Sequence, residues 1–146
     1  MKRILVPVDH SRGSDAIVEY ACAVARGLAA DLTLLHIYDP PNAAIALVPG
    51  ATVAGEDAAD RQAGTTLLER CAAIATANGF DHVDRIVERA DSPSRAIIAQ
   101  ARAGKFDLIV MGTHTRSGMS RLLMGSVAQD VLRGTTCPVL LVHLQT

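Results

Sequence analysis

A glycine-rich segment in the last quarter of the chain has the residue types that hold a phosphate group. It follows the apolar run 106–111, reads Gly112-Thr113-His114-Thr115-Arg116-Ser117-Gly118, and precedes Gly125-Ser126, where a short helix is expected to begin. Glycine lets the backbone turn sharply after a buried strand, and a helix amino terminus offers unpaired N–H groups to an anion. The sequence therefore predicts nucleotide binding at this segment.

Outside that segment, Asp9 is the best single candidate for a residue that contacts a nucleotide or a metal. It follows Pro7 and Val8 at the end of the first apolar run. In a doubly wound fold, an acidic residue directly after a strand near the switch point accepts hydrogen bonds from a ribose hydroxyl or holds a metal through water. Loops after strands favour aspartate in any case, so a helix-entry or turn role is the alternative. Both roles stay open at this point.

The chain has no visible apparatus for dedicated hydrolase chemistry. His114 lies in the candidate loop, but nothing gives it a fixed second partner, so a structural role for its ring is favoured. The histidines form no zinc set. The sequence contains neither a glycine-rich loop with lysine and Ser/Thr nor a nucleophile elbow, and capping by Ser14 explains the polar residues 11–15. We predict a protein that is not an enzyme, with slow ATP hydrolysis at most.

Repeated strand and helix patterns must position these residues. Apolar runs rich in β-branched residues occupy residues 3–8, 32–37, 83–88, 106–111 and 139–143, and helical patterns separate them, at about 14–28, 56–77, 93–103 and 126–134. Such repetition predicts an α/β fold with a parallel sheet. The ends of the first and fourth strands are then expected to face one crevice. One stripe of the first helix is expected to be buried: Ala16, Ile17, Tyr20, Ala21, Val24, Ala25 and Leu28.

Composition limits the class of protein and its partners. A chain of 146 residues with 49% hydrophobic residues fits one domain, spanning residues 1–146. A net charge of -1 and few aromatic residues argue against nucleic acid as a partner. No apolar run approaches membrane-spanning length, so no membrane partner is expected. Cys22, Cys71 and Cys137 are widely spaced and are interpreted as small buried hydrophobes, which suits a cytoplasmic location.

The chain resembles the universal stress protein family. The resemblance rests on the opening residues 4–9, the strand 34–37, the run 107–114, Gly125-Ser126-Val127-Ala128 and the closing run 137–142, in the right order over nearly the whole chain. It implies a single doubly wound domain with five parallel strands in the order 3-2-1-4-5, helices on both faces, and a fold like that of adenine-nucleotide alpha-hydrolases. It also implies a stress-response or signalling module.

The resemblance implies a role for each candidate residue in binding ATP or another adenine nucleotide, with or without Mg²⁺. Asp9 would face the adenosine end, and the backbone near Ile37 would meet the adenine edge. Gly112 would pass close beneath the ribose and phosphates, between Met111 and Thr113. The N–H groups and hydroxyl of Gly125, Ser126 and Val127 would hold the phosphate tail, while His114, Thr115 and Arg116 belong to the same loop.

Thr115 departs from the pattern of the ATP-binding members, which carry a second glycine at this position. If that glycine served a positive φ, threonine would cost on the order of 1–3 kcal/mol, and if it served close approach, the side chain would intrude on a phosphate. Alternatively, the threonine hydroxyl and Arg116 donate to phosphate oxygens. An adenine-nucleotide-binding homodimer is favoured, and a nucleotide-free dimeric interaction protein is the alternative.

The last strand predicts how two chains associate. Val139, Leu140, Leu141 and Val142 are apolar throughout and are expected at a sheet edge. An exposed apolar edge invites pairing with another strand. We expect antiparallel pairing with the same strand of a second subunit, which the resemblance also implies, and a further protein partner whose identity the sequence does not reveal.

Overall fold

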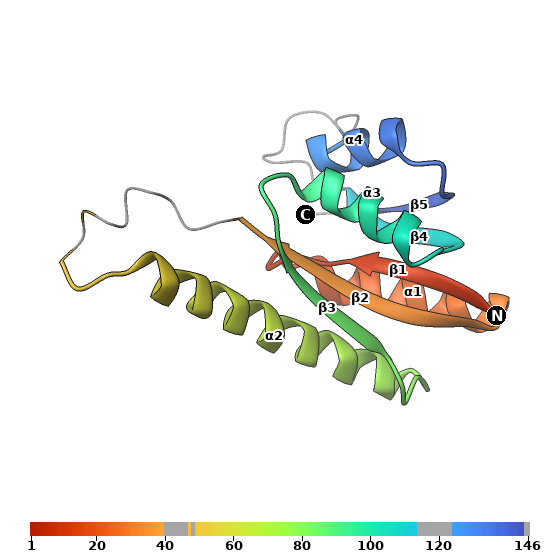
Figure 1. Ribbon diagram of the computed structural model, residues 1–146. Coiled ribbons are helices and arrows are strands. Elements are labelled where there is room, and N and C mark those ends of the chain that lie inside the picture. Colours follow the sequence, from red (N-terminus) through yellow and green to blue (C-terminus); the bar gives the residue numbers. More distant parts are fainter. Residues whose placement is uncertain (40–46, 48, 114–123, 145–146) are drawn as a thin grey trace.

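The computed structural model describes residues 1–39, 47, 49–113 and 124–144. This part of the chain alternates strands and helices: β1 (Lys2–Pro7), α1 (Ser14–Leu28), β2 (Ala30–Tyr38), α2 (Val53–Ala77), β3 (Asp84–Arg89), α3 (Pro93–Ala103), β4 (Leu108–Thr113), α4 (Ser126–Gly134) and β5 (Val139–His143) (Figure 1). All neighbouring strands pair in parallel, in the order β3-β2-β1-β4-β5. The predicted doubly wound fold and strand order are confirmed.

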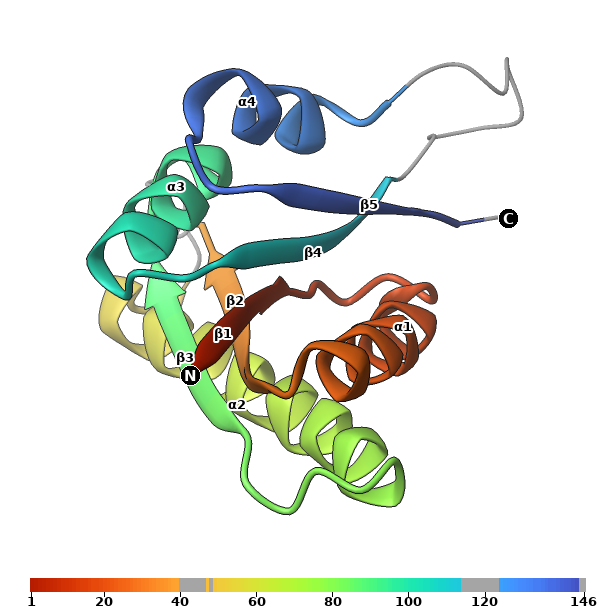
Figure 2. The same ribbon diagram turned by 90° about the vertical axis from the view of Figure 1, so that its right-hand side faces the viewer.

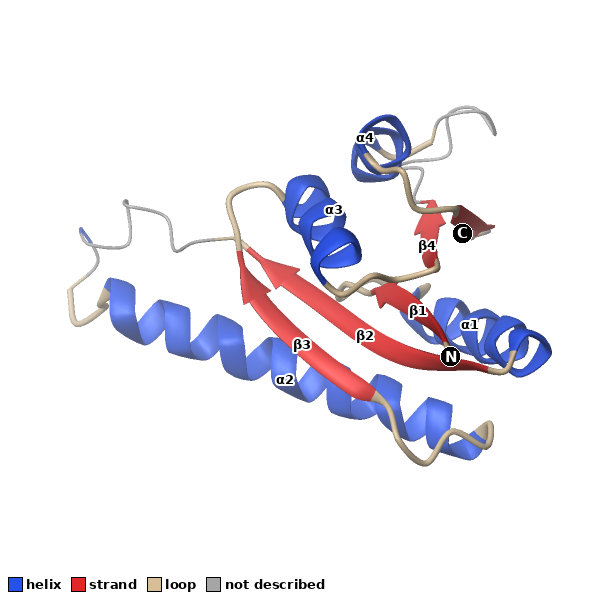
Figure 3. Ribbon diagram, turned by 45° about the vertical axis from the view of Figure 1, so that its right-hand side comes forward, coloured by secondary structure: helices blue, strands red, loops and turns tan. Residues whose placement is uncertain are grey.

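Each face of the sheet is covered by two helices, as Figure 3 shows. Because successive strand residues point to opposite faces, β1 sends Ile4 and Val6 toward α1 and α2 and sends Leu5 toward α3 and α4. The first cluster is completed by Val18, Ala21, Leu32, Leu34, Leu67 and Leu68, among others, and the second by Leu35, Ile97, Ile109, Met111 and Val131, among others. Burial on both faces explains the continuous apolar runs of the central strands.

Two helices differ from expectation at their amino termini, α1 in its cap and α2 in its first residue. α1 begins at Ser14, but its N-cap is Gly13 and no side chain of the described residues caps it, so the prediction that Ser14 is the cap was wrong. α2 begins at Val53, about three residues earlier than expected, because Thr52 caps it by accepting a hydrogen bond from the Gly55 N–H at 2.9 Å. No helix of the described chain has both the length and the apolarity that crossing a bilayer requires.

The buried face of α1 is rotated from the predicted stripe. Tyr20 and Leu28 are 59% and 39% exposed, so their expected burial was wrong, whereas Val18 and Cys22 are buried. The predicted stripe and the observed one share Ile17, Ala21 and Ala25, which lie where the two overlap. A 3.6-residue period therefore identified the helix but not which of two adjacent apolar stripes meets the sheet.

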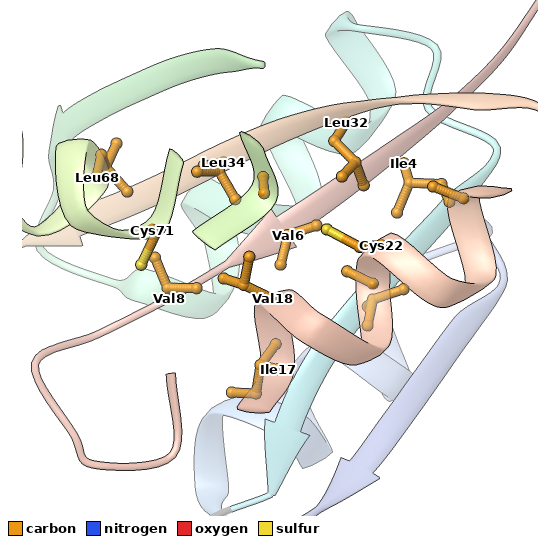
Figure 4. Packing of buried hydrophobic residues seen from close by; sticks show 14 of the residues in the cluster. Ile4, Val6, Val8, Ile17, Val18, Cys22, Leu32, Leu34, Leu68 and Cys71 are labelled. Carbon is orange, nitrogen blue, oxygen red and sulfur yellow. The ribbon is translucent and has the colours of Figure 1, made fainter. Parts of the chain in front are cut away.

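Two cysteines are part of the core between α1, α2 and the sheet. Figure 4 shows Cys22 beside Val6 and Leu32, and Cys71 beside Val8. Burial raises the pKa of both thiols above the ordinary value. Cys137 is half-buried, its thiol donates to the Phe106 carbonyl at 3.3 Å, and burial followed by the charge of Asp107 raises its pKa. The prediction of small buried hydrophobes holds for Cys22 and Cys71.

We expect these thiols to be protected until the chain unfolds. At pH 8 a disulfide reagent should modify Cys137 slowly and leave Cys22 and Cys71 unmodified, and all three should react in denaturant. Because the folded state holds the thiol protons more tightly, stability should fall as the pH rises above about 8.5, where unfolded cysteines ionise. Mass spectrometry after timed labelling checks the order in which the three thiols react, and rapid modification of Cys22 in the folded protein would contradict the prediction.

The two edge strands differ in character. β3 carries Asp84, Arg85, Glu88 and Arg89, and the side chains of Asp84, Arg85 and Arg89 are exposed. β5 reads Val-Leu-Leu-Val-His, and the side chain of Leu140 is 38% exposed. Charged side chains discourage pairing with another sheet, whereas an apolar edge invites it.

Candidate functional site

β1 and β4 separate toward their carboxyl ends. Their register pairs only Ile4 with Leu108 and Leu5 with Ile109. By contrast, the β1–β2 ladder continues to Pro7 and Leu35, and the β4–β5 ladder continues to Thr113 and His143. Figure 2 shows β4 and β5 side by side, both on the same side of β1. The chain crosses from one half of the sheet to the other between these strands, which is where ligands bind in open α/β sheets.

The loop after β1 holds Asp9 at one side of this opening. Its Oδ1 atom accepts a hydrogen bond from the Ser11 N–H at 2.9 Å and lies 3.4 Å from the Ser14 hydroxyl. That hydroxyl donates to the Asp9 carbonyl at 2.6 Å. The residue is exposed, so its carboxylate is both part of a turn and accessible from solvent. The turn role expected as the alternative is therefore present, and it does not withdraw the carboxylate from the surface.

The backbone just before Asp9 is held on β2. The Val8 N–H donates to the Leu35 carbonyl at 2.8 Å, and the Val8 carbonyl accepts from His36 Nδ1 at 2.9 Å. His36 is buried, and its ring meets the exposed ring of His10 edge to face, with 4.9 Å between centroids. The hydrogen bond from His36 therefore helps to hold the end of β1 in place. Among the described residues, no group of three or more metal-ligating side chains comes together.

The end of β4 forms the other side of the opening. Met111 and Thr113 are buried, and Thr113 Oγ1 lies 3.3 Å from His143 Nδ1 on β5. A Cβ atom on Gly112 would lie 2.6 Å from Ile17 Cδ1 of α1. A larger residue at this position would have to displace the Ile17 side chain of α1. Its predicted approach to a ribose and phosphates stays a prediction.

The amino terminus of α4 presents N–H groups that have no acceptor within the helix. Gly125 is the N-cap, and no side chain in the described part of the chain caps this helix. The first hydrogen bond of the helix runs from the Gln129 N–H to the Gly125 carbonyl at 3.1 Å, which leaves the N–H groups of Ser126, Val127 and Ala128 without intrahelical acceptors. Ser126 is exposed and Val127 half-buried. This end of α4 can accept an anion.

Most of the predicted site residues lie at the carboxyl ends of the strands. Pro7 ends β1 and Val8 and Asp9 follow it, Ile37 is near the end of β2, and Met111 to Thr113 end β4. Ile37 pairs with Glu88, whose Oε2 accepts from Gln100 Nε2 at 2.8 Å. His114, Thr115 and Arg116 lie outside the described residues. The binding roles of all these residues stay predictions.

Leu144 was missed by the sequence analysis. It follows β5 directly, and its side chain lies against both Gly13, before α1, and Gly112, in β4. The signal was present in the alternation of the last strand, because Leu144 falls on the same face as Val142, which packs toward α1.

A groove of about 480 Å³ lies at the other end of the sheet. Phe106, Asp107 and Pro138 line it where β4 and β5 begin, together with Arg102 and Lys105 at the end of α3. It therefore belongs to the amino ends of the strands, opposite the opening between β1 and β4.

Comparison with known proteins now decides the family. A family model described as the universal stress protein family matches residues 1–143. The chain belongs to this family. Among its relatives, the universal stress protein in the QAH/OAS sulfhydrylase 3′ region of Thermus aquaticus is 32% identical over 144 residues, covering 97% of this chain and 98% of that protein. The resemblance stated from the motifs is confirmed.

Solved structures share the fold of this universal stress protein. The hypothetical protein MJ0577 superposes with a TM-score of 0.81 at 25% identity, covering 99% of this chain and 97% of that one. A universal stress protein in complex with cAMP superposes with a TM-score of 0.76 at 24% identity, covering 99% and 98%. At that identity, the second likeness concerns the fold.

Proposed function

We propose that this universal stress protein binds an adenine nucleotide, with ATP as the preferred ligand, at the carboxyl ends of β1 and β4. The observation that carries the proposal is that the pairing of β1 with β4 ends at Leu5 and Ile109, at the point where the strand order reverses, with the amino terminus of α4, which no described side chain caps, on the β4 side of the fold. An anion gains from unpaired N–H groups and from the positive end of the helix dipole. The protein is then a binding module whose occupancy a partner senses, rather than an enzyme.

Each residue of the proposed site has a distinct role. The carboxylate of Asp9 accepts hydrogen bonds from ribose hydroxyls, and the backbone of Ile37 meets the adenine edge. The N–H groups of Ser126 and Val127, with the Ser126 hydroxyl, hold the phosphate tail. The family membership of the chain and the fold-level likeness to a complex with cAMP support an adenine nucleotide.

Calorimetry with ATP, ADP and AMP, each with and without Mg²⁺, tests the proposal. We expect measurable binding, and expect Asp9→Asn to weaken it about tenfold or more, since a hydrogen bond to a charged group contributes about 1.5–3 kcal/mol. Asparagine keeps the Oδ1 acceptor that the Ser11 N–H uses, so the turn is preserved. Asp84→Asn, exposed at the beginning of β3, is the control. No binding at millimolar nucleotide with Mg²⁺ would remove the proposal.

Thr115 favours a second candidate function, a nucleotide-free interaction protein whose phosphate site the threonine closes. The variant Thr115→Gly separates the two candidates. A large gain in ATP affinity over the natural chain supports the closed site, and equal affinities of the two chains argue for the binding module.

We also propose that the protein works as a homodimer paired through β5. The contrast between the charged β3 edge and the exposed Leu140 of β5 supports this. Sedimentation at micromolar concentration is expected to give the mass of two chains, and Leu140→Lys is expected to give one. Lys is chosen because a charge on the strand opposes pairing. A monomeric natural chain under the same conditions would contradict the proposal.

A further inference from the structure

Two glycines at the proposed site have backbones that do not require glycine. Gly13, the N-cap of α1, has φ of -80° and ψ of -9°, and Gly112 lies within β4. The glycines with positive φ in the described chain are Gly50 and Gly79. Any L residue could adopt the conformations at residues 13 and 112, so what glycine supplies there is space.

One methyl group occupies much of that space. A Cβ on Gly13 would overlap Leu144 Cδ1, and a Cβ on Gly112 would lie 2.9 Å from the same atom. Carbon atoms in contact normally lie about 3.5–4.0 Å apart. The Cδ1 methyl of Leu144 therefore lies in a notch formed by the two glycines, which we call the glycine notch.

The glycine notch joins the two sides of the opening. Gly13 ends the loop that begins at Asp9, and the Ser14 hydroxyl ties the start of α1 back to the Asp9 carbonyl. Gly112 is in β4, beyond the last residue that pairs with β1. Beyond the last pair of β1 and β4, the Leu144 side chain lies against both Gly13 and Gly112, and Ile17 of α1 lies against Gly112. A change in the size of residue 144 must therefore alter how the Asp9 loop packs against β4.

We propose that Leu144 is a positioning residue that sets the spacing between the Asp9 loop and β4, and through it the affinity for the nucleotide. This inference rests on the proposed function. The proposed role of Leu144 requires no contact with the ribose or the phosphates. Leu144 acts by holding Asp9 at a distance from Gly112 that lets one nucleotide contact both the Asp9 loop and β4.

A size exchange across the glycine notch tests the proposal. Leu144→Ala is expected to weaken ATP binding about tenfold, and Leu144→Met, which fills similar volume, should stay within about twofold of the natural chain. Gly13→Ala is also expected to weaken binding, because its methyl displaces Leu144. The double variant Gly13→Ala/Leu144→Ala should bind more tightly than either single variant, since the new methyl fills the vacated space.

Two controls separate positioning from general destabilisation. Leu28→Ala removes a leucine that is 39% exposed at the end of α1 and should leave ATP affinity unchanged. Gly112→Ala should not be rescued by Leu144→Ala, because its Cβ also meets Ile17. The proposal is overturned if Leu144→Ala binds ATP like the natural chain, or if the double variant is no better than the single variants.

Hydrogen exchange of the ligand-free protein distinguishes failure of this inference from failure of the proposed function. The Ser11 amide, which donates to Asp9 Oδ1, should exchange faster in Leu144→Ala than in the natural chain, relative to a core amide such as that of Leu34. If no nucleotide binds the natural chain, the proposed function fails. Unchanged exchange at Ser11 then overturns positioning as well, and faster exchange supports it.

Discussion

Replacing Leu34 with alanine is expected to lower the free energy of unfolding by about 2–5 kcal/mol, the largest effect anticipated for a single substitution in this chain. Leu34 is fully buried in β2, an interior strand between β3 and β1, where it packs in the cluster covered by α1 and α2. Removing its side chain costs the transfer free energy of the lost carbons and leaves a cavity that rigid neighbours fill poorly. A loss of this size is a large fraction of a total near 5–15 kcal/mol.

Urea denaturation followed by circular dichroism measures this change. The same chemical change at Leu132, on the exposed side of α4 and 41% exposed, is the control and is expected to alter stability by no more than about 0.5 kcal/mol. Equal losses for Leu34→Ala and Leu132→Ala would mean that the core is not where the fold places it.

Gly64→Ala is expected to destabilise the protein by about 1–3 kcal/mol, although alanine is the better helix former. A Cβ at this position in α2 would lie 2.8 Å from His36 Cδ2 and 3.0 Å from Val87 Cγ1. The His36 ring cannot move aside freely because its Nδ1 donates to the Val8 carbonyl. Relief of the contact must therefore move α2 away from the sheet or disturb the end of β1.

Gly27→Ala is the matched control for this substitution. Gly27 also lies in a helix, but a Cβ there would meet nothing within 4 Å. Alanine should then stabilise the protein by about 0.4–1 kcal/mol, because it reduces the entropy of the unfolded chain. Thermal denaturation should show melting temperatures that move in opposite directions, by about 3 °C for each kcal/mol. A rise for both variants would contradict the close packing of α2 on His36.

The elements of the fold were predictable where burial imposes a period on the sequence. β5 was predicted with the bounds observed, and so was the third helix, over residues 93–103. The first turn of α2 was missed because its alanine-rich, solvent-exposed residues carry no apolar period. Ser14 was misassigned because residue type favours it as a cap, whereas its hydroxyl bonds the Asp9 carbonyl.

The candidate site was predictable in its location more than in its contacts. Topology alone places Asp9 and Gly112 at the same edge of the sheet, since parallel strands end together. The alternation of β5 indicates which face of the sheet Leu144 is on, but its contact with Gly13, more than 100 positions away in the sequence, comes from long-range packing that no local pattern shows. The hydrogen bond from His36 Nδ1 to the Val8 carbonyl also joins residues that are distant in the sequence.

The unlike edges of the sheet limit how far this protein can assemble. A sheet with an apolar strand on one side and a charged strand on the other can gain a single neighbour through the apolar side. In the proposed dimer, two-fold pairing of β5 with its own copy would use the apolar side of both chains and leave the charged β3 strands outermost. The joined sheet would then have no apolar outer strand, so growth into a filament would stop at the pair.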